Sequence, residues 1–255
     1  MKHFFVAAVL ALVLGTSHTA SAQTLSMDMD PAELEKAVRK NELRRSPMYQ
    51  SLTAADNAGG FNEVEKAVKE SLGNFNKDER DAILQWLQDR TFGRSDANSL
   101  NIFFFRMYSE VKTLQAFTAS RLGRAEEQKE SAATALRALM VYGLVGLADA
   151  ARCGDASVDE AVRKDVSDRF RALSFTLKII PKEQYDLGAI DAVDIEQKTG
   201  ERPIDVGLCK MGEVGKGQKD YKPPSTPSTW NTHREYLRGI YKNEWSTRYY
   251  DLSKR

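Results

Sequence analysis

Glu110 is the acidic residue with the most apolar neighbourhood in this sequence, because it lies inside the aromatic segment of residues 103–117. A carboxyl group in such surroundings has a raised pKa and serves as a general acid in many enzymes. Glycoside hydrolysis needs only two carboxyl groups, so cleavage of a cell-wall glycan is one chemistry that the sequence allows. The alternative is an ion pair at the polar edge of a helix, with Lys112 or Arg106 as the partner. The burial habits of glutamate favour this alternative.

A serine and a lysine are also spaced as in an acyl-enzyme. Residues 109–112 match S-x-x-K, and residues 198–200 match K-T-G, motifs similar to those of penicillin-binding proteins and β-lactamases. The S-D-N motif of that family is missing between them, and the related residues 95–98 precede Ser109 instead. The family places K-T-G on a strand, whereas residues 196–198 are predicted to end a helix. We therefore do not expect acyl-enzyme chemistry.

Histidine is too scarce to support most nucleophilic or zinc-dependent chemistry. Of three histidines, His3 and His18 lie in an N-terminal leader that we expect to be removed, which leaves His233. A zinc site built on His and Cys needs three or four such ligands. A catalytic triad would have to use His233, and no G-x-S-x-G motif accompanies it. The sequence therefore predicts no metal site and no cofactor, with His233 as an ordinary helix-side histidine.

Four acids later in the chain raise the question of a calcium site. They have no D-x-[DN]-x-[DN]-G loop around them, and their helical spacing favours a solvated acidic face. These acids are Asp186, Asp191, Asp194 and Glu196.

The last expected helix, residues 230–255, combines a basic stripe with an aromatic one. Arg234, Arg238 and Lys242 recur at every fourth position, which places them on one helix face. Arginine and aromatic residues dominate protein interfaces, so this helix is the predicted contact surface. Docking of the aromatic stripe on the core is the more common arrangement for such residues and stays open. The predicted binding residues are Trp230, Arg234, Arg238, Tyr241, Lys242 and Trp245.

The two cysteines, Cys153 and Cys209, are predicted to form a disulfide in an oxidising compartment. A redox-active pair normally has Cys-x-x-Cys spacing near a βαβ unit, and neither feature is present. A disulfide that closes the loop from residue 153 to residue 209 stabilises the fold by about 4 kcal/mol in the chain-entropy treatment.

Residues 1–22 have the layout of a cleavable signal peptide. Lys2 precedes an apolar run over residues 4–14, and Ala20-Ser21-Ala22 completes a small-x-small cleavage pattern. No cysteine follows the apolar run, so we do not expect a lipoprotein. The sequence therefore predicts a periplasmic or secreted protein that starts near Gln23.

The charge balance excludes partners that are recognised by strong electrostatic attraction. Removal of Lys2 from 37 Lys and Arg leaves 36, against 36 Asp and Glu. A balanced chain has no long-range attraction to nucleic acid or to an anionic membrane. The longest apolar run after the leader, residues 138–148, is shorter than a membrane span, so no transmembrane segment is expected in the mature chain.

Helical periodicity runs through almost the whole mature chain. Seven or eight helices are expected, separated by short turns such as Gly123, with no convincing pair of strands. This predicts an all-α fold, a single multi-helix domain of antiparallel hairpins around a central helix. Residues 125–152 are the expected central helix. Residues 51–60 and 207–229 are expected to be loops.

We expect the chain to divide into four parts. These are a signal peptide (1–22), a helical core (23–211), a Gly/Pro-rich linker (212–229) and the C-terminal helix (230–255).

These observations together favour a non-catalytic exported binding protein whose partner is a protein or an envelope polymer. The alternative is a helical cell-wall glycan hydrolase that uses acids such as Glu110. A third reading is a carrier of small apolar ligands between residues 103–117 and 138–148.

Overall fold

The computed structural model describes residues 30–58, 61–73, 77–93, 101–200, 202–218 and 220–253. These residues form helices and connections without any strand, which confirms the predicted all-α class. The expected leader and residues 95–98 of the displaced S-D-N motif lie outside them. Contacts divide the chain into two compact units, Met1–Asn41 and Glu42–Arg255, and every helix after α2 belongs to the second.

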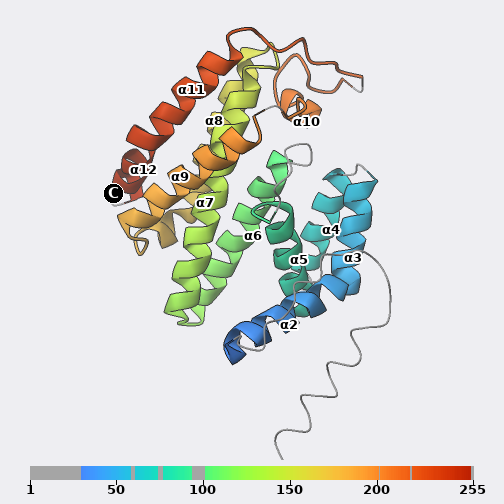
Figure 1. Cartoon of the computed structure of the whole chain (residues 1–255), viewed down its shortest axis with the longest axis vertical. Helices are drawn as coiled ribbons and strands as arrows, with labels where there is room; N and C mark the ends of the chain where they lie inside the picture. Colours follow the sequence, from blue (N-terminus) through green and yellow to red (C-terminus); the bar gives the residue numbers. More distant parts are fainter. Residues whose placement is uncertain are drawn as a thin grey trace, which may run out of the picture. The chain divides into compact units, whose positions relative to one another are not determined.

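The described residues contain eleven α-helices and one π-helical turn (Figure 1). In chain order they are α2 (Pro31–Arg45), α3 (Pro47–Asn57), α4 (Phe61–Gly73), α5 (Lys77–Arg90), α6 (Ile102–Arg121), α7 (Ala125–Ala150), α8 (Ala156–Leu177), α9 (Lys182–Lys198), α10 (Val206–Cys209), α11 (Trp230–Ile240), the π-helical turn (Tyr241–Trp245) and α12 (Ser246–Ser253).

The loop predicted for residues 51–60 was wrong, because α3 covers most of that segment. The Ser46 hydroxyl accepts a hydrogen bond from the Tyr49 backbone N–H at 3.3 Å, and Pro47 occupies the first helical turn. Serine before proline is a helix start signal, and the small polar residues that follow do not oppose it. Burial of Leu52 in the core holds the helix in place.

Side-chain caps fix the start of the two helices that flank α7. The Asn101 side chain accepts from the Phe103 backbone N–H at 2.9 Å, so α6 begins at Ile102. The aromatic run that follows Asn101 is helical, as the spacing of its apolar residues predicts. Asp155 caps α8 by accepting from the Ser157 backbone N–H at 3.0 Å.

Helix α7 is the most deeply buried element that the structure describes. Every residue from 138 to 150 is buried, including Tyr142 and Asp149. It is the one described helix with the length and apolar composition to cross a membrane. However, 83 % of its most apolar stretch is covered by other parts of the protein. The core helix of a globular domain has the same combination of length, apolar composition and burial.

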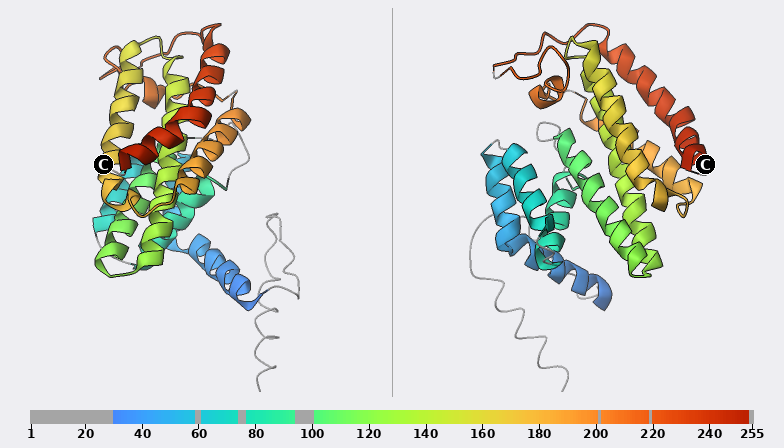
Figure 2. Two further views of the ribbon diagram at one scale, coloured as in Figure 1. Left: turned by 90° about the vertical axis from the view of Figure 1, so that its left-hand side faces the viewer. Right: turned by 180° about the vertical axis from the view of Figure 1, so that it is seen from behind.

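Among the described helices, α6, α8, α9, α10 and α11 pack against α7 (Figures 1 and 2). On one side α5 packs against α6, and α3 and α4 pack against α5. At the other side the π-helical turn and α12 pack against α9, and α12 also contacts α8. The C-terminal helix that the sequence predicts as one element is therefore divided by the π-helical turn and lies against the core.

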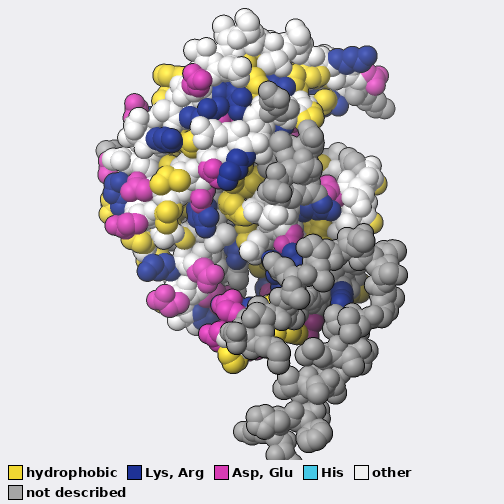
Figure 3. Space-filling view, viewed as in Figure 1, with side chains coloured by type: hydrophobic (Ala, Val, Ile, Leu, Met, Phe, Trp, Pro, Cys, Tyr) yellow, Lys and Arg dark blue, Asp and Glu magenta, His cyan; other side chains and the backbone are white. Residues whose placement is uncertain are grey.

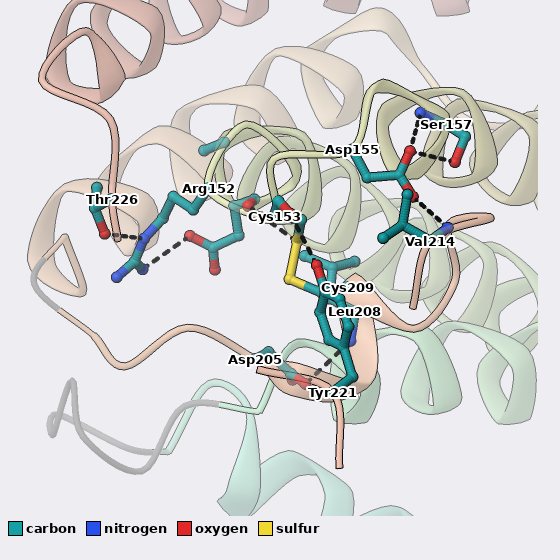
Figure 4. The surroundings of a disulfide bond; sticks show 12 residues. Arg152, Cys153, Asp155, Ser157, Asp205, Leu208, Cys209, Val214, Tyr221 and Thr226 are labelled. Carbon is teal, nitrogen blue, oxygen red and sulfur yellow. Dashed lines mark hydrogen bonds and ion pairs between the residues drawn. A yellow bond between two sulfur atoms is a disulfide. The ribbon is translucent and has the colours of Figure 1, made fainter. Parts of the chain in front are cut away.

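The predicted disulfide is present and joins the end of α7 to α10 (Figure 4). The Cα atoms of Cys153 and Cys209 lie 5.2 Å apart, and both side chains are buried. Gly154, at φ +66°, has the backbone conformation that glycine adopts freely. A Cβ atom there would lie only 2.7 Å from Pro224 Cγ, so this turn has no room for a larger residue.

Hydrogen bonds tie the segment between α10 and α11 to the end of α7 and the start of α8. The Asp155 carboxylate accepts from the Val214 backbone N–H at 2.9 Å, and the Tyr221 hydroxyl donates to the Cys153 carbonyl at 3.0 Å (Figure 4). The Arg152 Nε donates to the Thr226 hydroxyl at 3.2 Å. The segment expected to be a linker is thus attached to the core at several points.

Replacing both cysteines by alanine (C153A/C209A) should lower the free energy of unfolding by up to about 4 kcal/mol, because the open chain gains loop entropy on unfolding. Urea denaturation would measure the loss, with wild-type protein in reductant as the control. Thiol labelling of the wild type in denaturant, without reductant, should find no free cysteine. Labelling of both cysteines under these conditions would contradict the bridge.

Candidate functional site

The basic stripe of the C-terminal helix points toward a buried carboxylate. Arg234 and Arg238 of α11 each donate from Nε to Glu196 of α9, at 2.5 Å to Oε1 and Oε2 respectively. Glu196 is 0 % exposed, and Arg234 is buried with it. One carboxylate therefore binds two successive turns of α11 and sets the rotation of that helix.

Helix α9 carries Glu196 into the core because this residue lies on its apolar stripe. The buried positions Ala189, Ala192 and Val193 precede Glu196 at spacings of seven, four and three residues. Residues at these spacings share one helix face. This spacing is the sequence signal that separates Glu196 from the three aspartates with which we had grouped it on a solvated face.

Gly200, the second residue after the end of α9, leaves the space that Arg234 occupies. A Cβ atom on Gly200 would lie 2.2 Å from the Arg234 Nη2 atom. The guanidinium is held by Glu196 and also donates to the Glu196 backbone carbonyl, at 3.2 Å. It cannot easily move aside, so a side chain at position 200 would disturb the ion pair.

A second buried carboxylate extends the cluster toward the disulfide. Asp149 of α7 accepts from Arg202 Nε at 2.8 Å and from Arg152 Nη1 at 3.4 Å. Burial raises the pKa of Asp149, and its contacts with the two guanidinium groups act in the opposite direction. Burial also lowers the pKa of Arg152.

The whole cluster carries more positive than negative charge. Its acids are Asp149 and Glu196, and its bases are Arg152, Arg202, Arg234 and Arg238, which is four cations against two anions. Hydrogen bonds from the arginines to neutral carbonyl groups compensate part of the surplus positive charge. Arg202 donates to the Thr199 carbonyl at 3.0 Å and Arg152 donates to the Arg202 carbonyl at 3.0 Å.

Trp230 covers this arginine cluster at the start of α11. Its indole N–H donates to the Ala148 carbonyl at 2.7 Å, which anchors α11 to α7. The guanidinium carbons of Arg152 and Arg234 lie 4.4 and 4.5 Å from its ring centroid, within the range of cation–π attraction. The tryptophan is only 8 % exposed.

A shallow depression of about 530 Å³ lies beside Trp230 on the surface. His233 lines it, and the His233 Nε2 atom is shielded from solvent without a hydrogen-bond partner among the described residues. Tyr236 also lines it and is 65 % exposed, which is unusual for so large a side chain. The full lining is Ala151, Pro227, Thr229, Trp230, Thr232, His233 and Tyr236.

The remaining predicted binding residues divide between the core and the solvent. Tyr241 is fully buried and stacks on Trp245, with ring centroids 4.4 Å apart. Burial raises the pKa of the Tyr241 hydroxyl well above its ordinary value. Lys242, in the π-helical turn, is exposed. The six residues thus do not form one surface, and their role in binding stays a prediction.

Every acid that the sequence suggested for chemistry has a cationic partner. Glu110 is paired with Arg169 rather than with Lys112 or Arg106. The aspartates of α9 form three further pairs, Asp186 with Lys182, Asp191 with Arg137, and Asp194 with Lys198. No group of three or more His, Cys, Asp or Glu side chains among the described residues is arranged to hold a metal ion.

The residues of the acyl-enzyme motifs are engaged elsewhere. Ser109 is buried in α6, and burial lowers the pKa of Lys112, whose ammonium donates to Gln115 at 3.0 Å. Lys198 forms a surface ion pair with Asp194 at 2.6 Å. These contacts give no support to a serine nucleophile.

No protein-family model, no curated protein and no solved structure matches this chain.

Replacing Glu196 by glutamine (E196Q) should lower the free energy of unfolding by about 3–5 kcal/mol, because it leaves two largely buried guanidinium groups without their counter-charge. The matched control is Asp194→Asn, two residues earlier on α9, where the carboxylate pairs with Lys198 at the surface. We expect that change to cost less than about 1 kcal/mol. Urea denaturation would compare the two, and equal losses would contradict a structural role for Glu196.

Proposed function

We propose that this chain is a non-catalytic exported protein that binds a protein or an envelope polymer through the depression at the start of α11. The observation that carries the proposal is the position of Tyr236 and His233 beside Trp230. An exposed aromatic ring beside a rigid floor is typical of a contact surface.

The rigidity of this floor supports the proposal. Trp230 is fixed by its hydrogen bond to Ala148, and Arg234 is fixed by Glu196. A partner that binds here would not have to order these groups, so less conformational entropy is lost on binding. The antiparallel helical hairpins that we propose around α7 would supply the same rigidity to the whole surface.

Export is part of the proposal and rests on the sequence of residues 1–22. A disulfide between Cys153 and Cys209 is compatible with an oxidising compartment, where such bonds persist. The mature chain would then begin near Gln23 and act in the periplasm or outside the cell.

The ion pairs of the suggested acids favour binding over glycan hydrolysis. A general acid must present a proton to the leaving group, whereas the Glu110 carboxylate is engaged by Arg169. Clearing of purified peptidoglycan by the wild type but not by Glu110→Gln would support the alternative, a cell-wall hydrolase. We expect no clearing by either protein.

Deletion of the C-terminal helix is not a clean test, because Leu237 and Tyr241 belong to the core. Point changes are better suited. We expect a photo-crosslinking amino acid at position 236 to give a discrete adduct in intact cells, because this side chain lines the depression. The same amino acid at Glu160, an exposed position on α8, serves as the control and should give no such adduct.

A second variant tests the histidine. His233→Ala, combined with the crosslinker at position 236, should lower the yield of the adduct several-fold, since it removes a side chain that lines the depression. Circular dichroism would show that the helices remain. Identical adducts at positions 236 and 160, or none at position 236, would contradict the proposed surface.

A further inference from the structure

A narrow cavity lies between α7, α8 and the π-helical turn with α12. Its volume is about 10 Å³, close to the room that one water molecule needs. The wall formed by α7 and α8 consists of Leu136, Leu139, Met140, Val166 and Phe170. The opposite wall consists of Tyr241, Trp245 and Tyr249. The cavity shares no residue with the depression beside Trp230, so this inference stands apart from the function proposed above.

The Tyr241 hydroxyl is a buried donor without an acceptor at this cavity. Tyr241 is 0 % exposed, and its oxygen has no hydrogen-bond partner among the described residues. This oxygen lies against Gly143 of α7, where a Cβ atom would approach it to 2.6 Å. Val166, which lines the cavity, lies 3.4 Å from the same Cβ position, so the hydroxyl is at the cavity wall. Buried polar groups are normally hydrogen-bonded, so this one calls for an acceptor from outside the chain.

Aromatic rings in mutual contact form one side of the cavity. The Tyr241 and Trp245 rings are stacked, with centroids 4.4 Å apart and an interplanar angle of 14°. Tyr249 meets Trp245 edge-on at 5.0 Å and packs against Phe170 at 4.5 Å. Aromatic rings attract one another in such arrangements. A flat ring that enters the cavity would therefore find the same contacts.

The outer part of this aromatic wall is where the cavity would open. Trp245 and Tyr249 are only half-buried, whereas Tyr241 is fully enclosed. Trp245 also ends the π-helical turn, a rare element that is frequent at functional sites. A ligand the size of one ring needs an outward movement of Trp245 and Tyr249, because the closed cavity has room for little more than one water molecule. Pockets of this kind are minor states that a ligand makes dominant.

We propose that the cavity at the π-helical turn binds a small neutral aromatic molecule that carries one carbonyl group. The ring would insert beside Trp245 and Tyr249, and the carbonyl oxygen would accept a hydrogen bond from the Tyr241 hydroxyl. None of the lining residues is charged, whereas basic and acidic side chains are interspersed on the face of the molecule shown in Figure 3. An uncharged lining disfavours ions, and a single buried donor favours a single acceptor. The sequence suggested an apolar ligand between α6 and α7, whereas this cavity lies between α7 and α8.

The test compares two probes of nearly the same shape. Acetophenone has the carbonyl group, and α-methylstyrene has a CH₂ group in its place. Amide chemical shifts in NMR titrations of the chain as its host produces it would give both dissociation constants. We expect the largest shifts in the π-helical turn, and about fivefold tighter binding of acetophenone, which is the value of one hydrogen bond.

Tyr241→Phe tests the donor. The preference for acetophenone should disappear or reverse, because its carbonyl group then leaves water without gaining a partner. The urea midpoint should not fall, because the hydroxyl that is removed has no partner. The matched control is Tyr185→Phe, since Tyr185 is also fully buried but donates to the Leu177 carbonyl at 3.3 Å. That change should lower the urea midpoint and leave the preference for acetophenone as in the wild type.

Trp245→Leu tests the aromatic wall and should weaken the binding of both probes several-fold. Its control is Phe175→Leu, an exposed ring of α8 outside the cavity, which should bind both probes as the wild type does. Equal affinity of the wild type for the two probes, or shifts that lie away from the π-helical turn, would overturn the proposal. So would a loss of stability in Tyr241→Phe equal to that in Tyr185→Phe, which would mean that a bound water already accepts from the Tyr241 hydroxyl.

Discussion

The burial of Glu196 is the constraint on which the arrangement of the C-terminal third depends. A carboxylate that is fully removed from water is unfavourable by several kcal/mol unless opposite charges and hydrogen bonds compensate it. Helix α9 supplies none of that compensation itself, because the residues on the same face are apolar. The two arginines of α11 supply it, so Glu196 sets the rotation of α11, and the hydrogen bond from Trp230 to Ala148 anchors the start of the same helix.

Most helices could be predicted from the sequence because their apolar residues recur at helical spacing over three or more turns. This holds for α8, whose buried apolar residues recur at spacings of three and four from Val158 to Leu177. Helix α3 was missed because its residues are small and polar and only Leu52 is buried, so tertiary contact rather than pattern holds it. The π-helical turn at Tyr241–Trp245 also has no local signal, since its sequence continues the helical pattern without a break.

For the candidate site, the sequence predicts which arginines share a helix face but not which residue that face contacts. The spacing of Arg234 and Arg238 places both on one helix face, and the structure has them there. What that face meets depends on a residue 38 positions away for Arg234, and no local pattern reports such a distance. The disulfide was accessible to prediction because the chain has only two cysteines, which leaves one possible intramolecular pairing.

Net charge is a poor guide to this molecule because charges of opposite sign are distributed unevenly. In the core four arginines are gathered around two acids, and a balanced composition gives no sign of that local surplus. At the end of α6, by contrast, the exposed Arg124 has the nearby carboxylate of Glu127 as its partner. Attraction to a surface depends on the charges within about one Debye length of it, roughly 8 Å at physiological salt. A balanced total therefore does not reveal the balance of charge in one part of the molecule, which depends on the contacts of individual side chains.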